Sequence, residues 1–149
     1  MKRTVVLLLI LLVLSLSALA QQKTVVRHAK AAKMLLGKHR VSLQWISWDH
    51  FGTATVVNRS GDYRLKGEQR GRGSEDLLTV DGKITSIVAK RFVFVGKVVT
   101  QISHINGGKP CTREGEMTFK ITGERKYWRM QEIDNPCDQA ADYVDIYFR

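Results

Sequence analysis

The sequence predicts an all-β protein: a small antiparallel meander that forms an up-and-down β-barrel of calycin-like build or a sandwich. Two observations predict this class. Apolar and polar residues alternate along several short segments after residue 37, and short turn sequences separate most of these segments. A third observation is that no repeated helical crossover interrupts them, which argues against a parallel sheet. The segments number eight to ten, and a sheet of that size avoids exposed edges by closing or by packing on a second sheet.

Residues 1–20 have the pattern of a secretory signal peptide. A short basic start is followed by the apolar run Val5–Leu14 and by Ala18-Leu19-Ala20, the small residues of a cleavage site. We expect cleavage before Gln21. The apolar stretch is shorter than the roughly 20 residues that span a bilayer, so an uncleaved membrane anchor is the weaker alternative. The sequence therefore predicts a secreted or periplasmic protein with no transmembrane segment after cleavage.

Residues 21–37 form a basic N-terminal segment, and the stretch from Gln21 to Arg40 contains six Lys or Arg residues and no acidic one. Residues 24–36 have helical character, and Gly37 is placed to end the helix. Two interpretations stay open. The helix lies over one end of the domain with its lysines in solvent, or its basic face contacts anionic lipid or polysaccharide. The short, alanine-rich apolar face favours the first.

Residues 38–149 are predicted to form a single β domain. A glycine, Gly96, interrupts the longest apolar segment and indicates a bend or a bulge. The Gly-x-Trp opening typical of lipocalins is absent, since the chain reads Gly37-Lys38-His39. The predicted strands are residues 41–45, 53–58, 63–68, 77–80, 84–88, 92–102, 116–122, 126–133 and 144–148.

Turn residues predict three hairpins. If Ser60-Gly61 is a two-residue loop, Val56 lies opposite Leu65 and apolar side chains share one face. Asp81-Gly82 predicts a second hairpin between the two apolar segments that flank it. If Gly123-Glu124 is also a two-residue loop, Phe119 lies opposite Trp128, and Met117 lies opposite Met130. These four side chains are expected to point inward with Val41, Leu43 and Trp45.

The two cysteines, Cys111 and Cys137, are predicted to form a disulfide. An exported chain with an even number of cysteines usually oxidises them, and the third hairpin places the pair nearly opposite each other. A zinc site needs closely spaced ligands, and neither cysteine has another cysteine or a histidine within a few residues.

Composition and motifs exclude several functions. The net charge is +10, or +8 once Lys2 and Arg3 leave with the signal peptide. No nucleophile elbow, metal-ligand spacing or nucleotide loop is present, so we expect no enzyme, no cofactor and no metal. Five carboxylates near the C-terminus lack calcium-loop spacing and are interpreted as balancing the basic surface: Glu132, Asp134, Asp138, Asp142 and Asp145. The segment from Arg70 to Gly73 is interpreted as a flexible loop, because export makes a nucleic-acid partner improbable.

The sequence thus favours a non-catalytic binding module whose partner it does not identify. A small amphiphile or an anionic envelope component is the expected ligand. If the barrel is hollow, four aromatic side chains are expected to line it, and if it is packed solid they fill the core. Those residues are Trp45, Tyr63, Phe119 and Trp128.

One alternative is a secreted inhibitor or a protein-interaction domain that uses its basic outer face. A candidate partner surface on that face comprises Tyr127, Arg129 and Gln131, with solvent as the other interpretation. A small hydrolase is the remaining alternative, since catalytic residues can assemble in space without a sequence motif.

Overall fold

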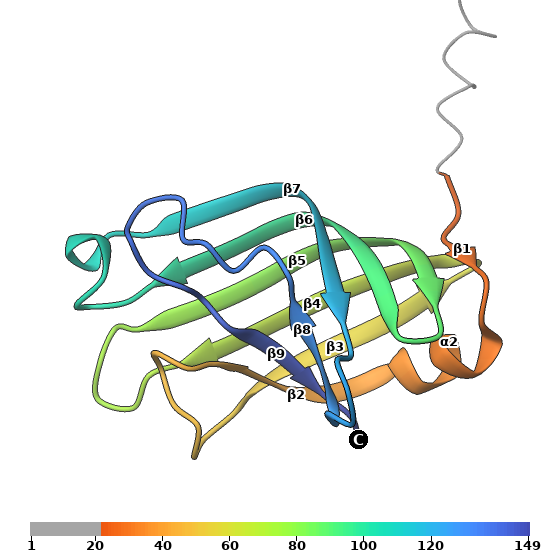
Figure 1. The fold of residues 1–149 in the computed structure, drawn as a ribbon, viewed down its shortest axis with the longest axis horizontal. Helices are drawn as coiled ribbons and strands as arrows, with labels where there is room; N and C mark the ends of the chain where they lie inside the picture. The colour runs from red at the N-terminus through yellow and green to blue at the C-terminus, as the bar shows by residue number, and fades with distance from the viewer. Residues whose placement is uncertain (1–21) are drawn as a thin grey trace, which may run out of the picture.

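The computed structural model describes residues 22–149, so the predicted signal peptide, residues 1–20, lies outside the described residues. Eight antiparallel strands, β2 to β9, pair in sequence order, and β9 pairs back with β2 to close a barrel (Figure 1). The predicted up-and-down barrel is therefore confirmed. The elements are β1 (Val25–Val26), α2 (Ala29–Leu35), β2 (Gly37–Leu43), β3 (Gly52–Arg59), β4 (Asp62–Arg70), β5 (Leu77–Val88), β6 (Arg91–Gln101), the short 3₁₀ turn η1 (Asn106–Gly108), β7 (Cys111–Lys120), β8 (Tyr127–Met130) and β9 (Val144–Tyr147).

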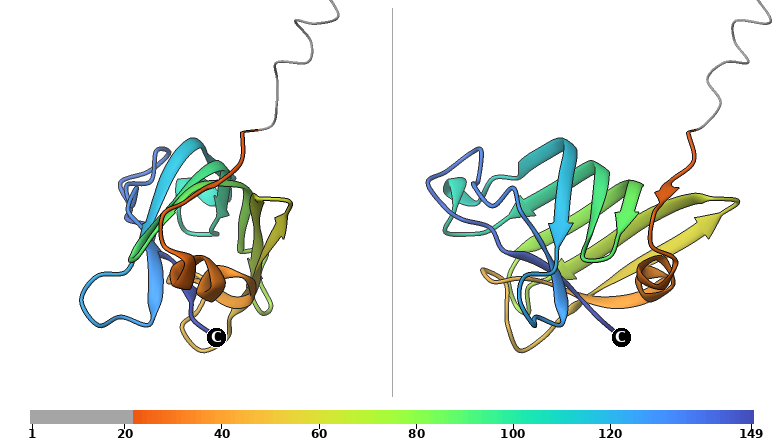
Figure 2. Two further views of the ribbon diagram at one scale, coloured as in Figure 1. Left: turned by 90° about the vertical axis from the view of Figure 1, so that its right-hand side faces the viewer. Right: turned by 45° about the vertical axis from the view of Figure 1, so that its right-hand side comes forward.

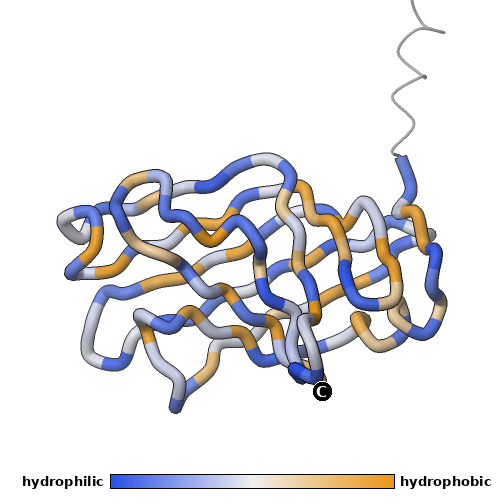
Figure 3. Tube along the Cα trace, in the orientation of Figure 1, coloured by the Kyte–Doolittle hydropathy of each residue, from blue (hydrophilic) through white to orange (hydrophobic). Residues whose placement is uncertain are grey.

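Side chains fill the inside of the barrel. Apolar and polar residues alternate along the strands (Figure 3), and in β4 every second residue from Tyr63 to Gln69 is buried. The ring of Phe92 is stacked on that of Phe119 at 5.0 Å between centroids, and Trp128 meets Phe92 edge to face at 6.0 Å. Met117 and Met130 are also buried, at 3% and 0% exposure. The interior is thus a packed hydrophobic core.

The hairpin at Ser60-Gly61 has the predicted register, with Val56 opposite Leu65. Both turn residues have positive φ, 53° and 92°, as a type I′ turn requires. The side chain of Asn58 accepts a hydrogen bond from the Gly61 backbone N–H at 2.8 Å and stabilises the turn.

The hairpin predicted at Asp81-Gly82 is wrong, because β5 runs without a break through both residues. Gly82 lies opposite Gly96 of β6, and Gly96 lies opposite Gly115 of β7, so glycines from three strands form a row. A Cβ atom on Gly82 would lie 2.6 Å from the Gly96 Cα. The close approach of the β5 and β6 backbones, and not a turn, explains why residue 82 is a glycine.

The predicted register of the third hairpin is also wrong. Phe119 lies opposite Met130 and not Trp128, a shift of two residues. The connection is longer than two residues because Ile121 continues along the sheet beyond β7. Its backbone N–H donates a hydrogen bond of 2.8 Å to the carbonyl oxygen of Lys90, the residue just before β6. A two-residue shift keeps each side chain on the same face, so Phe119 and Trp128 still point inward.

The helix is shorter than predicted. Val25 and Val26 instead form β1, which pairs in parallel with Ser86 and Ile87 of β5. This part of β5 extends beyond its pairing with β4, so β1 covers an edge that would otherwise be open. The helix α2 follows and lies across one end of the barrel (Figure 2), where Ala31, Ala32 and Leu35 join the core. No helix in residues 22–149 is long and apolar enough to cross a membrane.

Candidate functional site

A pocket of about 470 Å³ opens at the end of the barrel opposite α2. Three segments that are distant in the sequence form its walls: the chain after β2, the β6–β7 connection and the β8–β9 loop. We call it the mouth pocket. Its lining residues are Gln44, Trp45, His104, Ile105, Asp138, Gln139, Ala140, Ala141 and Tyr143.

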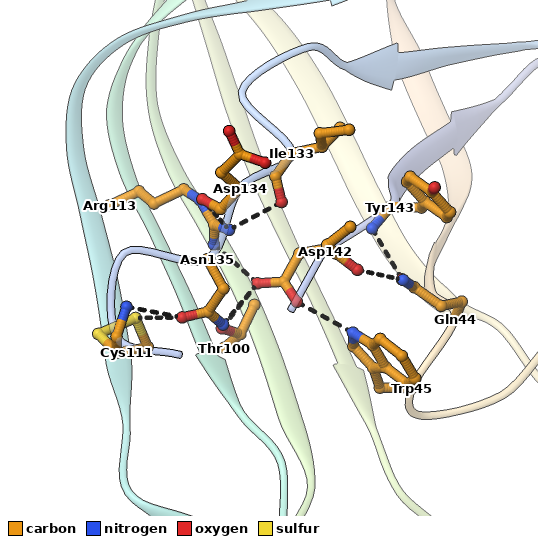
Figure 4. Close-up of polar contacts among 12 residues, drawn as sticks. Gln44, Trp45, Thr100, Cys111, Arg113, Ile133, Asp134, Asn135, Asp142 and Tyr143 are labelled. Atoms are coloured by element: carbon orange, nitrogen blue, oxygen red, sulfur yellow. Dashed lines mark hydrogen bonds and ion pairs between the residues drawn. A yellow bond between two sulfur atoms is a disulfide. The ribbon is translucent and has the colours of Figure 1, made fainter. Parts of the chain in front are cut away.

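A buried carboxylate, Asp142, organises the wall behind this pocket (Figure 4). Its Oδ1 accepts a hydrogen bond from Trp45 Nε1 at 3.0 Å. Its Oδ2 accepts one from Asn135 Nδ2 at 3.0 Å and a longer one from the Thr100 hydroxyl at 3.4 Å. Because Asp142 is completely buried, these donors replace the water that a carboxylate normally binds.

Arg113 of β7 supplies the charge that balances Asp142. Its Nη1 lies 2.9 Å from Asp142 Oδ2, yet the N–H bonds are not aligned with that oxygen, so the contact is an ion pair without a hydrogen bond. Its Nη2 donates to the carbonyl oxygens of Ile133 at 3.4 Å and Asp134 at 2.9 Å. Arg113 thereby fixes the β8–β9 loop to the barrel wall.

The disulfide between Cys111 and Cys137 holds the same loop, and the predicted pairing is confirmed. The backbone N–H of Cys137 donates to Asn135 Oδ1 at 2.8 Å, which links the disulfide to Asn135. On the other side, Gln44 accepts a hydrogen bond from the Tyr143 N–H at 2.7 Å and donates to the Ala141 carbonyl oxygen. The pocket wall is therefore preorganised by covalent, ionic and hydrogen-bonded contacts.

The accessible groups of the mouth pocket combine aromatic surface with polar edges. His104 meets Trp45 edge to face at 5.8 Å between ring centroids. Hydrogen bonds from the backbone N–H groups of Asn106, at 2.6 Å, and Gln139, at 2.7 Å, lower the pKa of Asp138 from its ordinary value. Asp138 also joins η1 to the β8–β9 loop by this contact. Among the described residues no Lys or Arg lines the pocket, so this lining offers stacking and hydrogen bonding without a cationic side chain.

The other histidines contact backbone groups. His28 Nδ1 accepts from the Ala31 N–H at the start of α2, and His50 Nε2 lies 3.2 Å from the Arg70 carbonyl oxygen. The ring of His39 lies between the carbonyl oxygens of Tyr147 and Leu35, at 2.9 and 2.7 Å. Within residues 22–149, no three His, Cys, Asp or Glu side chains are arranged to hold a metal ion.

The structure does not bring the four predicted cavity residues together in one pocket. Tyr63, Phe119 and Trp128 lie in the packed core, at 8%, 0% and 2% exposure. Trp45 lies at the mouth, where its ring lines the pocket. The aromatic residues thus divide between packing and the candidate site.

The predicted partner surface lies on the outer wall of the barrel. Arg129 donates two hydrogen bonds of 2.7 Å to Asp145, which is completely buried beneath it. The guanidinium also lies 4.3 Å from the Tyr143 ring centroid and 5.3 Å from that of Tyr127. The bond to Asp145 raises the pKa of Arg129. Gln131 is exposed and donates to the backbone oxygen of Arg129.

Sequence reasoning missed most residues of the mouth pocket and of the network behind it. Asp142 was expected only to balance surface charge, and it is instead buried and paired with Arg113. Neither Gln44 nor His104 belongs to a motif. The only available signal was the disulfide, because it predicts that the β8–β9 loop is tied to β7.

The fold and the site define a class: a packed eight-stranded up-and-down barrel with a ligand-sized pocket at its mouth, supported by a buried ion pair. The chain belongs to the PM1083 family, whose model matches residues 23–148. It is 43% identical over 135 residues to a Pasteurella multocida (strain Pm70) protein named uncharacterized protein PM1083, and the alignment covers 91% of this chain and 87% of that protein. No solved structure matches the chain.

Proposed function

We propose that this protein is an exported, non-catalytic binding module that takes a small ligand at the mouth pocket. The observation that carries this proposal is the rigid pocket wall, in which Asp142, Arg113 and the disulfide hold aromatic and polar groups around an open space of about 470 Å³. Binding sites are commonly concave, preformed and lined by apolar surface with a few polar groups.

The lining favours an uncharged amphiphile with one flat apolar face and a hydrogen-bonding edge. The rings of Trp45 and Tyr143 offer surfaces for the apolar face, while Gln139 and His104 offer hydrogen-bonding groups. The carboxylate of Asp138 disfavours an anion at this pocket. A neutral oligosaccharide has the required combination of an apolar ring face and hydroxyl or amide edges.

Export is supported by the N-terminal sequence pattern and by the disulfide, which persists in oxidising compartments. Intact-mass analysis of the exported protein should give a chain that begins at Gln21 and is two mass units lighter than the dithiol form, as one disulfide requires. Recovery of the full-length chain in the membrane fraction alone would contradict export.

The ligand class is tested by calorimetric titration with the trimer of N-acetylglucosamine. We expect saturable binding, lost in Trp45→Ala and weakened in His104→Ala. Trp48→Ala is the matched control, because Trp48 is half-exposed and does not line the pocket. Absence of saturable binding, or equal binding by Trp45→Ala and the native protein, would overturn the proposed ligand class.

A further inference from the structure

A second pocket, of about 440 Å³, opens beside the start of β2. The last backbone pair between β2 and β9 is Val41 with Ile146, and the two segments separate beyond it. The side chain of His39 contacts the Tyr147 carbonyl oxygen and is buried between them. We call this pocket the basic groove. Its lining residues are Lys38, His39, Arg40, Thr53, Phe148 and Arg149.

The basic groove carries three cationic side chains that form no ion pair with a described residue. The side chains of Lys38, Arg40 and Arg149 form no ion pair with any group in residues 22–149. No Asp or Glu side chain from residues 22–149 lines the groove. Lys38 and Arg40 also lie on the same outer face of β2, because they are two residues apart. The groove therefore gathers three cationic side chains and no acidic side chain of the described residues.

One of these cations, Arg40, is held in place by aromatic rings. The Arg40 guanidinium lies over the ring of Phe51 at 4.5 Å and near that of Tyr147 at 5.3 Å, measured to the centroids. A guanidinium stacked on aromatic faces keeps its N–H edge available for an oxyanion. The side chain of Arg149 lies over Gly37, where a Cβ atom would be only 3.0 Å from Nη1.

Phe148 gives the groove an apolar wall. Its ring packs edge to face on the core residue Trp128, at 4.6 Å between centroids, and remains partly exposed. Because the ring is anchored to the core, it offers a fixed surface inside the groove and is poorly placed to insert into a membrane. The groove thus places an apolar surface beside forked cationic donors.

We propose that the basic groove binds an oxyanion head group attached to a small apolar body, such as an alkyl phosphate monoester. Forked guanidinium donors match the oxygens of a phosphate, and Phe148 accommodates the first carbons of the alkyl chain. This site is separate from the mouth pocket, since the two lie at opposite ends of β2.

The experiment is calorimetric titration of the oxidised, processed protein with hexyl phosphate at low salt. Saturable binding is expected, with an affinity that falls as salt is added and is roughly tenfold lower in Arg40→Gln. Inorganic phosphate should bind more weakly than hexyl phosphate, and hexyltrimethylammonium should not bind. Lys66→Gln, which removes the same charge from an exposed lysine on the outer wall, should bind as the native protein does.

Three results would overturn the proposal: equal weakening by Lys66→Gln and Arg40→Gln, equal affinity for inorganic and hexyl phosphate, or binding only to vesicles that contain phosphatidylglycerol. The first would show an effect of net charge alone, and the third would assign the cations to a membrane surface. Thermal melting checks that each variant folds. Titration of Arg40→Gln with the N-acetylglucosamine trimer should be unchanged, so the two sites are tested separately.

Discussion

Arg113 and Asp142 form an ion pair inside the protein, with side chains that are 7% and 0% exposed. The arginine belongs to β7, and the aspartate lies in the loop just before β9. Because Asp142 also accepts the indole N–H of Trp45, the ion pair connects the barrel wall directly to the mouth pocket. Its contribution to stability depends on both charges being present.

Replacing Asp142 alone should be severely destabilising. In Asp142→Leu the buried Arg113 loses its counter-charge, and the expected loss in the free energy of unfolding is about 3–5 kcal/mol. Urea denaturation measures it. The double variant Arg113→Met/Asp142→Leu removes both charges and should recover much of that loss. A single variant within about 1 kcal/mol of the native protein would contradict a role for the pair.

Removing the disulfide should also destabilise the fold. The chain-entropy model gives roughly 3.5 kcal/mol for a loop of this length, within the 2–5 kcal/mol that is typical of small secreted domains. The variant Cys111→Ala/Cys137→Ala is compared with the native protein by denaturation, with and without reductant. Reductant should lower the stability of the native protein only, and an equal effect on both would show that it acts elsewhere.

The core tryptophan Trp128 should matter far more for stability than the exposed tryptophan Trp48. Trp128→Ala removes a ring that packs on Phe92 and Phe148, so the expected cost is about 3–5 kcal/mol. Trp48→Ala, at a side chain that is 50% exposed, should change stability by no more than about 0.5 kcal/mol. Thermal and chemical denaturation compare the two, and similar losses would contradict the packed interior.

The glycine row should not tolerate a side chain. In Gly82→Ala the new Cβ would meet the Val95 carbonyl oxygen at 2.4 Å as well as the Gly96 backbone, so the strands must move apart. Overpacking of this kind costs about 1–3 kcal/mol. The control is Asp81→Ala at the neighbouring exposed position, which should stay within about 0.5 kcal/mol. A neutral Gly82→Ala would show that the row has no steric role.

The contact between Asp138 and η1 should weaken in acid. Hydrogen bonds from Asn106 and Gln139 lower the pKa of Asp138 in the folded protein below the ordinary value of 3.8. The stabilisation is therefore fully present above the unfolded pKa and is lost as the pH falls through the lower, folded pKa.

Carboxyl carbon NMR should show a midpoint for Asp138 below 3.8, and the Asn106 amide resonance should move with the same midpoint. Asp138→Asn should abolish that amide shift. A midpoint at or above 3.8 would contradict the two hydrogen bonds.

The sequence by itself determined the all-β class, most of the core-facing residues and the cysteine pair, and the structure decided between barrel and sandwich. These follow from local signals: a period of two places Phe119 and Trp128 on one face, and Ser60-Gly61 adopts the turn that its residues favour. The signal failed at Asp81-Gly82, where pairing of β5 with strands on both sides outweighs the turn preference.

Only the tertiary structure decided where the two pockets lie. The mouth pocket joins Trp45, His104 and Tyr143. The basic groove joins Lys38 to Arg149, which lie near the beginning and at the end of the barrel's sequence. Strand alternation specifies which way a side chain points but not which distant loop it meets. That depends on closure of β9 onto β2 and on the buried partners of Asp142, which are long-range contacts without a local pattern in the sequence.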